Sequence, residues 1–405
     1  MDYKRIKKQL RESIQNRLDF GKDWTDQDIQ EAIDEAVINS DEAAFCSLEL
    51  RKRLRKELFD SLRRLDILQI FVEDPEISEI MINGNEAIFV EKKGRIIPLD
   101  IRFDSLEKLN DVIQRIVAGC NRVVNEASPI VDARLSDGSR VNVVMPPIAL
   151  NGPIVTIRRF PEHPITMEQL IGFQSISGEA AGFLQRLVEA RYNIFISGGT
   201  GSGKTTFLNV LSAFIEPSAR VITVEDSAEL QLVKISNLVR LETRNSNMEG
   251  CREISMRDLI RSSLRMRPDR IIVGEVRGPE AFDMLQCMNT GHDGSMCTGH
   301  ANSARDMLSR LENMILMGME LPLTAIRQQI ASGIDILVHL GRLRDKSRRV
   351  MEVWEILGVS DGEYQLSPLY LFEENGETED GKVLGELVRK GELQNVRKLK
   401  EAGLS

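Results

Sequence analysis

The 405-residue sequence predicts an α/β fold, in which a smaller α+β domain and an N-terminal helical segment precede a mostly parallel sheet covered by helices. Three observations support this prediction. Strand and helix patterns alternate from about residue 165 to 358, which is typical of parallel βαβ units. Short strand patterns separated by turns fill residues 67–160. Residues 1–66 are rich in charged residues and Leu at helical spacing, with almost no Gly or Pro.

The N-terminal segment, residues 1–66, predicts two or three helices. Thr25 and Asp28 have the spacing of a capping box at the start of a helix. That helix has an apolar stripe formed by Ile29, Ala32, Ile33 and Val37. Ser40-Asp41 is placed to cap a longer helix that runs through Leu65. We expect the stripe to pack against neighbouring helices, and docking onto a partner is the alternative.

Residues 67–160 predict a separate α+β domain. Alternating apolar residues and turn signals predict strands at 77–82, 87–90 and 95–99, a hairpin at 132–144 and a last strand at 154–160. A helix at 105–119 interrupts these strands. The next four residues, 161–164, contain two prolines, which resist both a helix and a central strand. They are the predicted linker to the domain at 165–405.

Composition limits the classes of protein that fit. The chain has 53 Lys and Arg against 62 Asp and Glu, a net charge of −9, which argues against a nucleic-acid partner. No apolar run reaches the roughly 20 residues of a membrane span, and the charged N-terminus has no signal-peptide core. The five cysteines form no C-x-x-C pair, so no disulfide framework and no Cys-rich zinc site are predicted. A cytoplasmic location fits best.

A phosphate-binding loop is the most specific motif in the sequence. The residues Gly198, Gly199, Thr200, Gly201, Ser202, Gly203, Lys204, Thr205 and Thr206 match the pattern G-x-x-x-x-G-K-[ST]. A strand pattern at 193–197 leads into the loop and a helix pattern leads out of it. The loop N–H groups and the helix N-terminus would bind phosphate oxygens, and Lys204 would bridge the β- and γ-phosphates. The Thr205 hydroxyl is the natural ligand for Mg²⁺.

Two further strand patterns end in carboxylates. The strand at 220–224 is followed by Glu225-Asp226 and then Glu229, and the strand at 270–274 is followed by Glu275. In α/β sheets, ligands bind at the carboxyl ends of strands. We therefore expect these side chains near the phosphate loop, where they would order the Mg²⁺ water shell and the attacking water.

Two of the four histidines lie close together, at His292 and His300. A zinc site formed with Cys297 is conceivable, although its spacing is poor. We prefer a segment that senses the γ-phosphate, in which both imidazoles respond to the charge lost on hydrolysis.

The phosphate loop, Glu225-Asp226-x-x-Glu229, the segment 270–277 and the histidine segment 290–300 occur in the order seen in the secretion ATPase superfamily. This superfamily powers type II and type IV secretion and type IV pili, and the resemblance covers about residues 70–405. It implies a RecA-like P-loop NTPase domain preceded by an α+β (PAS-like) domain. The stretches 74–84, 132–141 and 289–295 most resemble the CpaF-like ATPase of Tad/Flp pilus assembly. The C-x-x-C zinc insertion usual in pilus extension and type II motors is absent from the sequence.

The resemblance also implies roles for residues outside the phosphate loop. Glu275 would polarise the attacking water and, with Thr205, hold Mg²⁺ directly or through water. Arginines of the α+β domain would approach the nucleotide. Arg140 and Arg158 match best, with Arg134 as a third. Strand alternation allows only one of Arg158 and Arg159 to face the nucleotide, and Arg158 is preferred.

ATP and Mg²⁺ are the cofactors that the resemblance implies, since no guanine-reading motif is present. The implied partners are further copies of the chain in a homo-hexamer and the inner-membrane platform proteins of a pilus or secretion system. The protein would then lie at the inner face of the cytoplasmic membrane. Three alternatives are a conjugation-type type IV secretion ATPase, a nucleotide-gated assembly or regulatory subunit with little turnover, and a DNA-translocating motor. The acidic balance disfavours the last. The sequence does not indicate the transported substrate.

Overall fold

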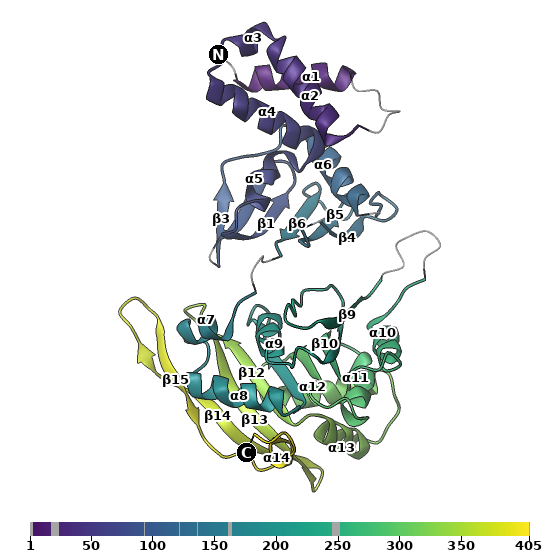
Figure 1. The fold of residues 1–405 in the computed structure, drawn as a ribbon, viewed down its shortest axis with the longest axis vertical. Coiled ribbons are helices and arrows are strands. Elements are labelled where there is room, and N and C mark those ends of the chain that lie inside the picture. Colours follow the sequence, from purple (N-terminus) through teal and green to yellow (C-terminus); the bar gives the residue numbers. More distant parts are fainter. Residues whose placement is uncertain are drawn as a thin grey trace. The chain divides into compact units, whose positions relative to one another are not determined.

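A computed structural model describes residues 3–17, 24–92, 94–120, 122–135, 137–160, 164–244 and 252–404. The chain forms two compact units, Met1–Pro161 and Glu162–Ser405 (Figure 1). Of the predicted linker, residues 161–163 lie outside the described residues. Within the described ranges, every helix is too short or too polar to cross a bilayer.

The first unit begins with a bundle of helices. They are α1 (Tyr3–Arg17), α2 (Asp26–Ile38), α3 (Asp41–Ala44) and α4 (Leu48–Arg63). The predicted capping box is confirmed, since Thr25 and Asp28 bond reciprocally at the start of α2. The predicted long helix from Ser40 to Leu65 is wrong. Ser40 caps only α3, and α4 starts separately at its own cap, Ser47.

A six-stranded sheet follows the bundle. Its strands are β1 (Ile77–Asn83), β2 (Ala87–Lys92), β3 (Arg95–Leu99), β4 (Ile130–Arg134), β5 (Arg140–Val144) and β6 (Ile154–Arg158), after the short η1 (Asp66–Leu68) and α5 (Gln69–Val72). The order is β3-β2-β1-β6-β5-β4, and every neighbouring pair is antiparallel. Helix α6 (Leu106–Gly119) buries an apolar stripe that includes Leu109, Ile113 and Ile116 in the core of this unit. The α+β prediction is thereby confirmed.

The second unit is built on a nine-stranded sheet in the order β15-β14-β13-β12-β7-β11-β10-β8-β9. Six neighbouring strands are parallel, namely β12 (Ile336–Arg342), β7 (Ile194–Gly198), β11 (Met296–His300), β10 (Arg270–Val276), β8 (Arg220–Glu225) and β9 (Asn237–Glu242). The remaining three strands are antiparallel. They are β13 (Arg348–Ser360), β14 (Glu363–Glu377) and β15 (Val383–Arg389).

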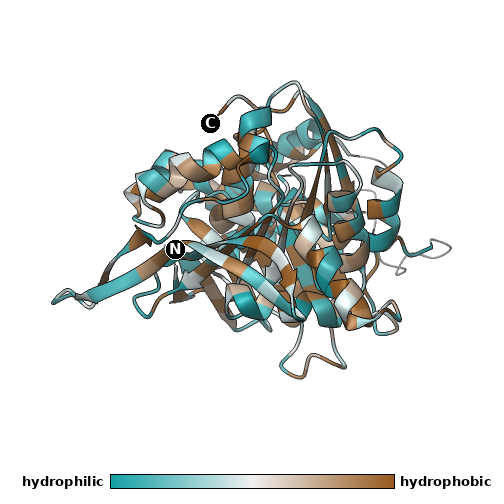
Figure 2. Ribbon diagram, turned by 90° about the horizontal axis from the view of Figure 1, so that it is seen from below, coloured by the Kyte–Doolittle hydropathy of each residue, from teal (hydrophilic) through white to brown (hydrophobic). Residues whose placement is uncertain are grey.

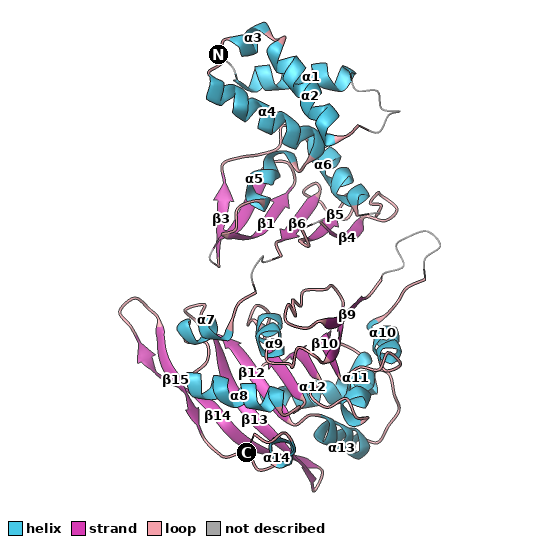
Figure 3. Cartoon of the chain, viewed as in Figure 1, coloured by secondary structure: helices cyan, strands magenta, loops and turns pink. Residues whose placement is uncertain are grey.

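Helices cover both faces of the parallel strands (Figures 1 and 3). Ile194 and Ile196 of β7 pack in one apolar layer with α7 (Met167–Gly172), α8 (Gly178–Glu189) and α9 (Lys204–Ser212). Phe195 points into the other layer, which contains α10 (Met256–Ser263), α11 (Glu280–Asn289), α12 (Ala304–Leu316) and α13 (Leu323–Gly333). Figure 2 shows hydrophobic residues concentrated along the central strands. The prediction of a mostly parallel α/β sheet is confirmed. The sequence showed it because strands that are buried on both faces need apolar residues throughout.

The C-terminal tail differs from its prediction. The sequence from Asp361 onward is charged and punctuated by Gly, a pattern that predicts a tail with a final helix, and the structure has that helix as α14 (Arg397–Glu401). It also has the antiparallel strands β14 and β15, which the sequence did not reveal. Their side chains are mostly half-buried or exposed, so the polar residues that dominate them hide the strand pattern.

Candidate functional site

The phosphate loop connects the end of β7 to the start of α9. Gly201 and Gly203 have φ values of +71° and +93°, a left-handed conformation that glycine adopts without steric cost. At Gly198, a Cβ atom would lie 2.5 Å from Ser202 Oγ and 2.6 Å from the Leu340 carbonyl oxygen. The glycines therefore let the backbone fold into the tight loop that phosphate binding requires. Ser202 Oγ is buried in this loop without a hydrogen-bond partner among the described residues.

Lys204 is buried at the start of α9 and turns back over the loop. Its Nζ donates to the carbonyl oxygens of Gly198 and Gly199, each at 3.1 Å, and lies 3.2 Å from Nδ1 of His300. Burial lowers the pKa of Lys204, and the negative charge of Glu275 partly offsets that effect. The ammonium is thus held where the phosphates of a nucleotide would need it.

The predicted site elements meet at one edge of the sheet. The neighbouring strands β7, β11, β10 and β8 are parallel, and Gly198 is in register with His300. Glu275 lies near the carboxyl end of β10, and Glu225 ends β8. The structure thus places the phosphate loop, His300, Glu275 and Glu225 on four consecutive strands.

His300 joins the lysine to the carboxylate. Its Nε2 lies 2.9 Å from Oε1 of Glu275, while its Nδ1 faces Lys204. Burial lowers the pKa of His300, and Glu275 only partly opposes this. Because an ammonium can only donate, Nδ1 of a neutral ring accepts from Lys204, while Nε2 lies near Oε1 of Glu275 without a hydrogen bond between them.

Arg277 fixes the other oxygen of Glu275. Its Nη2 and Nε lie 2.7 Å and 3.1 Å from Oε2 of Glu275. Its Nη1 also lies 3.8 Å from Oδ2 of Asp226, which follows β8. No role for Arg277 was predicted, although it lies within the segment 270–277 that supports the resemblance. Arg277 brings the two predicted carboxylates to one guanidinium.

Glu225 is buried beneath the site. Its Oε2 accepts from the backbone N–H groups of Glu229 and Leu230 at 2.7 Å and 3.0 Å. Desolvation is larger than the effect of these hydrogen bonds and raises the pKa of Glu225 to about 7. A Cβ on Gly274 would lie 3.0 Å from Glu225 Cγ, so the adjacent strand leaves room for this side chain. A carboxyl that titrates near 7 can exchange a proton at physiological pH.

His292 lies away from these residues, which corrects the prediction that both imidazoles face the γ-phosphate. It precedes β11, whereas His300 ends it, and the five residues of this strand span about 13 Å. His292 Nδ1 lies 3.3 Å from the carbonyl oxygen of Cys287 instead. The alternative zinc grouping of His292, Cys297 and His300 is separated for the same reason. Within the described ranges, no three His, Cys, Asp or Glu side chains gather as a metal site.

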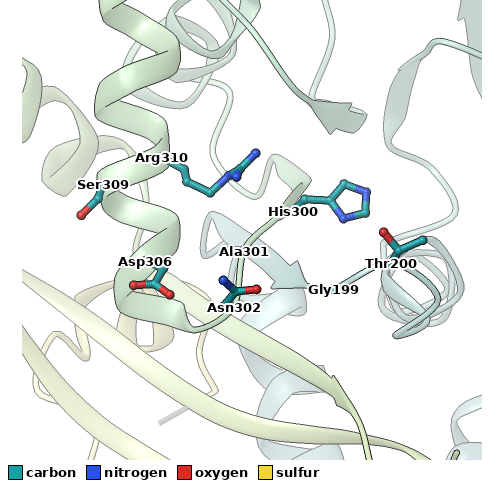
Figure 4. Close-up of a pocket in the computed structure, with 8 residues that line it drawn as sticks. All are labelled: Gly199, Thr200, His300, Ala301, Asn302, Asp306, Ser309 and Arg310. Atoms are coloured by element: carbon teal, nitrogen blue, oxygen red, sulfur yellow. The ribbon is translucent and has the colours of Figure 1, made fainter.

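A cavity of about 400 Å³ opens beside the loop. Its lining comes from Gly199 and Thr200 of the loop, from His300 to Asn302, and from Asp306, Ser309 and Arg310 of α12 (Figure 4). His300 and Thr200 lie on one side of this cavity and the α12 side chains on the other. The α12 residues were not predicted, because nothing in their spacing connects them with the phosphate loop.

The arginines named from the resemblance lie in the first unit. Cross-strand register pairs Arg134 with Arg140, and Arg140 with Arg158, so the three form one row on one face of the sheet. Glu79 continues the row on β1. Arg159 differs, because its guanidinium bonds the backbone carbonyls of Asp74 and Ile77. The register thus sets Arg158, rather than Arg159, beside Arg140.

Comparison with known proteins identifies the family. Residues 62–368 match the family model described as "Type II/IV secretion system protein". The conjugal transfer protein TrbB of Rhizobium radiobacter is 33% identical over 333 residues, which cover 81% of this chain and 98% of TrbB. The type IV secretion system protein PtlH of Bordetella pertussis is 30% identical over 316 residues, 72% of this chain and 93% of PtlH.

A solved structure supports the fold. The pilus retraction motor PilT, crystallised with bound ADP, aligns over 85% of this chain and 87% of its own, with a TM-score of 0.53 and 19% identity. An N-terminal domain followed by a P-loop ATPase domain is thus the shared architecture. The family match and the two relatives confirm the superfamily that the motif order predicted. This chain belongs to the type II/IV secretion system protein family, whose members are secretion ATPases.

Proposed function

We propose that the protein is an ATP-hydrolysing motor that works as a homo-hexamer and drives pilus assembly or protein secretion at the inner membrane. The observation that carries the proposal is the convergence of Lys204, His300, Glu275 and Glu225 on four consecutive parallel strands. Lys204 and the loop N–H groups would bind the phosphates. ATP hydrolysis as a family trait supports the reaction.

Residues of the site suit a nucleotide with Mg²⁺. The glycine-shaped loop leaves its N–H groups free of Cβ obstruction, and the Thr205 hydroxyl and Glu275 carboxylate are the oxygen donors that Mg²⁺ prefers. A bound Mg²⁺ would neutralise charge on the β- and γ-phosphates. Asp226 would help to order water around the ion.

Glu275 is the proposed group that polarises the attacking water. Arg277 bonds Oε2 of Glu275 and His300 lies 2.9 Å from Oε1, so the carboxylate is oriented before substrate arrives. Glu225 would assist through its near-neutral pKa. Arg140 and Arg158 would stabilise charge on the transferred phosphoryl group. Support for these two comes from their adjacent places in one row and from the bidentate geometry of guanidinium.

Glu275→Gln tests the catalytic assignment. We expect this variant to retain ATP binding and to lose turnover by 10²-fold or more, about the cost of one preorganised charge contact. Glu216→Gln is the control, because Glu216 precedes β8 at the opposite edge of the sheet. Wild-type turnover in Glu275→Gln would reject the assignment. A wild-type protein that binds ATP but never hydrolyses it, alone or with membrane partners, would instead indicate a nucleotide-gated subunit.

The transport system is a finer part of the proposal. The stretches at 74–84 and 289–295 favour a CpaF-like motor of Tad/Flp pili. A conjugation-type secretion ATPase is the second candidate, favoured by the similarity to TrbB over almost its whole length. Neighbouring genes separate the two, since pilin and prepilin peptidase genes would support the first and a conjugative transfer cluster the second. Turnover stimulated by DNA would favour a DNA-translocating motor over both.

A further inference from the structure

Two arginines face each other at the end of the hairpin that joins the parallel and antiparallel parts of the large sheet. Arg342 ends β12 and Arg348 begins β13, and the register pairs them directly. Leu340 is in register with Gly198, so Arg342 lies two residues beyond the start of the phosphate loop. The hairpin therefore brings both side chains beside the loop.

Both arginines lie close to the phosphate loop. Arg348 Nε donates to the Gly201 carbonyl oxygen at 2.8 Å, and its Cδ would lie 3.4 Å from a Cβ on Gly203. Arg342 Nη1 would lie 3.7 Å from a Cβ on Gly201. Arg348 thus fixes the Gly201 carbonyl and leaves the loop N–H groups for the ligand.

This pairing is electrostatically unfavourable by itself. Like charges directly opposite each other in antiparallel strands destabilise the pair. Arg344, in the same hairpin, bonds Glu374 and Glu377 of β14. Among the ion pairs of the described residues, none involves Arg342 or Arg348. A polyanion in the adjacent loop would relieve this repulsion, because it brings several negative charges close to both guanidinium groups.

We propose that Arg342 and Arg348 form a cationic brace behind the phosphate loop, which positions Gly201 and adds affinity for the polyphosphate of a nucleotide. This inference rests on the proposed nucleotide site and adds two positioning residues to it. Their effect grows with the number of phosphates on the ligand. It acts through nucleotide binding.

Binding of fluorescent ATP, ADP and AMP analogues with Mg²⁺ tests the brace in the full chain. We expect Arg342→Gln and Arg348→Gln to weaken ATP binding about tenfold and AMP binding less than twofold, with ADP between them. In contrast, nucleotide-free Arg342→Gln should melt at a higher temperature than the wild type, because its repulsion with Arg348 is removed. A merely structural arginine would not produce that increase.

Arg344→Gln is the matched control, since it removes a charge from the same hairpin but away from the loop. We expect it to bind ATP within twofold of the wild type. The brace is wrong if Arg342→Gln and Arg348→Gln bind ATP like Arg344→Gln, or if they lose ATP and AMP affinity equally. A wild type that binds ATP without hydrolysing it rejects the motor and leaves this binding test intact. Normal hydrolysis by the wild type, together with unchanged nucleotide affinities in Arg342→Gln and Arg348→Gln, would reject only the brace.

Discussion

Glu225 shows how burial at a single residue couples the site to the stability of the fold. The folded pKa of about 7 lies above the ordinary value of 4.5, so the folded protein binds a proton that the unfolded chain releases. That contribution to stability is fully present below pH 4.5 and is lost as the pH rises through 7. At alkaline pH the ionised carboxylate opposes folding, which is the cost of placing it behind the nucleotide site.

Replacing this carboxyl tests the sign of the effect. We expect Glu225→Gln to be more stable than the wild type at pH 8 by about 2–3 kcal/mol, because the amide carries no charge to desolvate. The advantage should vanish at about pH 4, below the ordinary pKa of the carboxyl. Urea unfolding at the two pH values measures it, with the exposed Glu216→Gln as the control that shows no such change. An equal difference at both pH values would contradict the assignment.

Sequence patterns predicted the phosphate loop of the site and missed residues that reach the site from distant parts of the chain. The glycines at 198–203 and Lys204 reveal themselves because their chemistry is contiguous in sequence. Arg348 could not be predicted, since 147 residues separate it from the carbonyl that it contacts. His292 was misplaced because strand β11 lies between it and His300. The two histidines are close in sequence but lie at opposite edges of the sheet.

At the scale of elements, the C-terminal helix α14 is attached to the edge of the sheet opposite the phosphate loop. Lys398 Nζ lies 2.8 Å from a carboxylate oxygen of each of Asp293 and Asp335, and 3.2 Å from the carbonyl oxygen of Arg191. The Tyr192 hydroxyl bonds the Asn395 carbonyl at 2.6 Å just before the helix. A helix of five residues has little stability of its own, so these contacts hold it in place.

Lys398→Met tests this attachment. We expect the change to lower the free energy of unfolding by about 1–2 kcal/mol, because it removes hydrogen bonds to the partly buried carboxylate of Asp335 and to the exposed one of Asp293. The C-terminal segment should also be cut earlier in limited proteolysis. Lys400→Met, on the exposed side of the same helix, is the control and should behave like the wild type. Equal cleavage rates for the two variants would show that Lys398 does not hold the helix.

The predictability of elements follows their burial. Three strands of the parallel region, β7, β8 and β10, were foreseen because both of their faces are buried and most of their residues are apolar. The break between α3 and α4 was missed, since Ser47 lies within a helical pattern and its cap is visible only as a side-chain contact. In β14, exposed and half-buried polar residues conceal a strand of 15 residues.

At the scale of the whole molecule, the two units have separate apolar cores. Calorimetry should therefore resolve two unfolding transitions. ATP with Mg²⁺ should raise the midpoint temperature of the transition that belongs to residues 162–405. Ile113→Ala should lower the midpoint temperature of the transition of the smaller unit. Ile113 is fully buried there, and its truncation leaves a cavity that costs about 2–5 kcal/mol. If ATP raises both transitions together, the arginine row is coupled to the nucleotide.

The antiparallel strands of the large sheet have a practical consequence for the design of shorter fragments of the protein. A fragment trimmed to the family match would stop at residue 368, inside β14, and would omit β15 and α14. The outer edge of β13 would then be only half covered, and an uncovered strand edge invites aggregation. It would also lose Leu369 and Tyr370, two buried side chains of the layer that packs on α8 and α9. The useful boundary for recombinant expression therefore lies beyond residue 401.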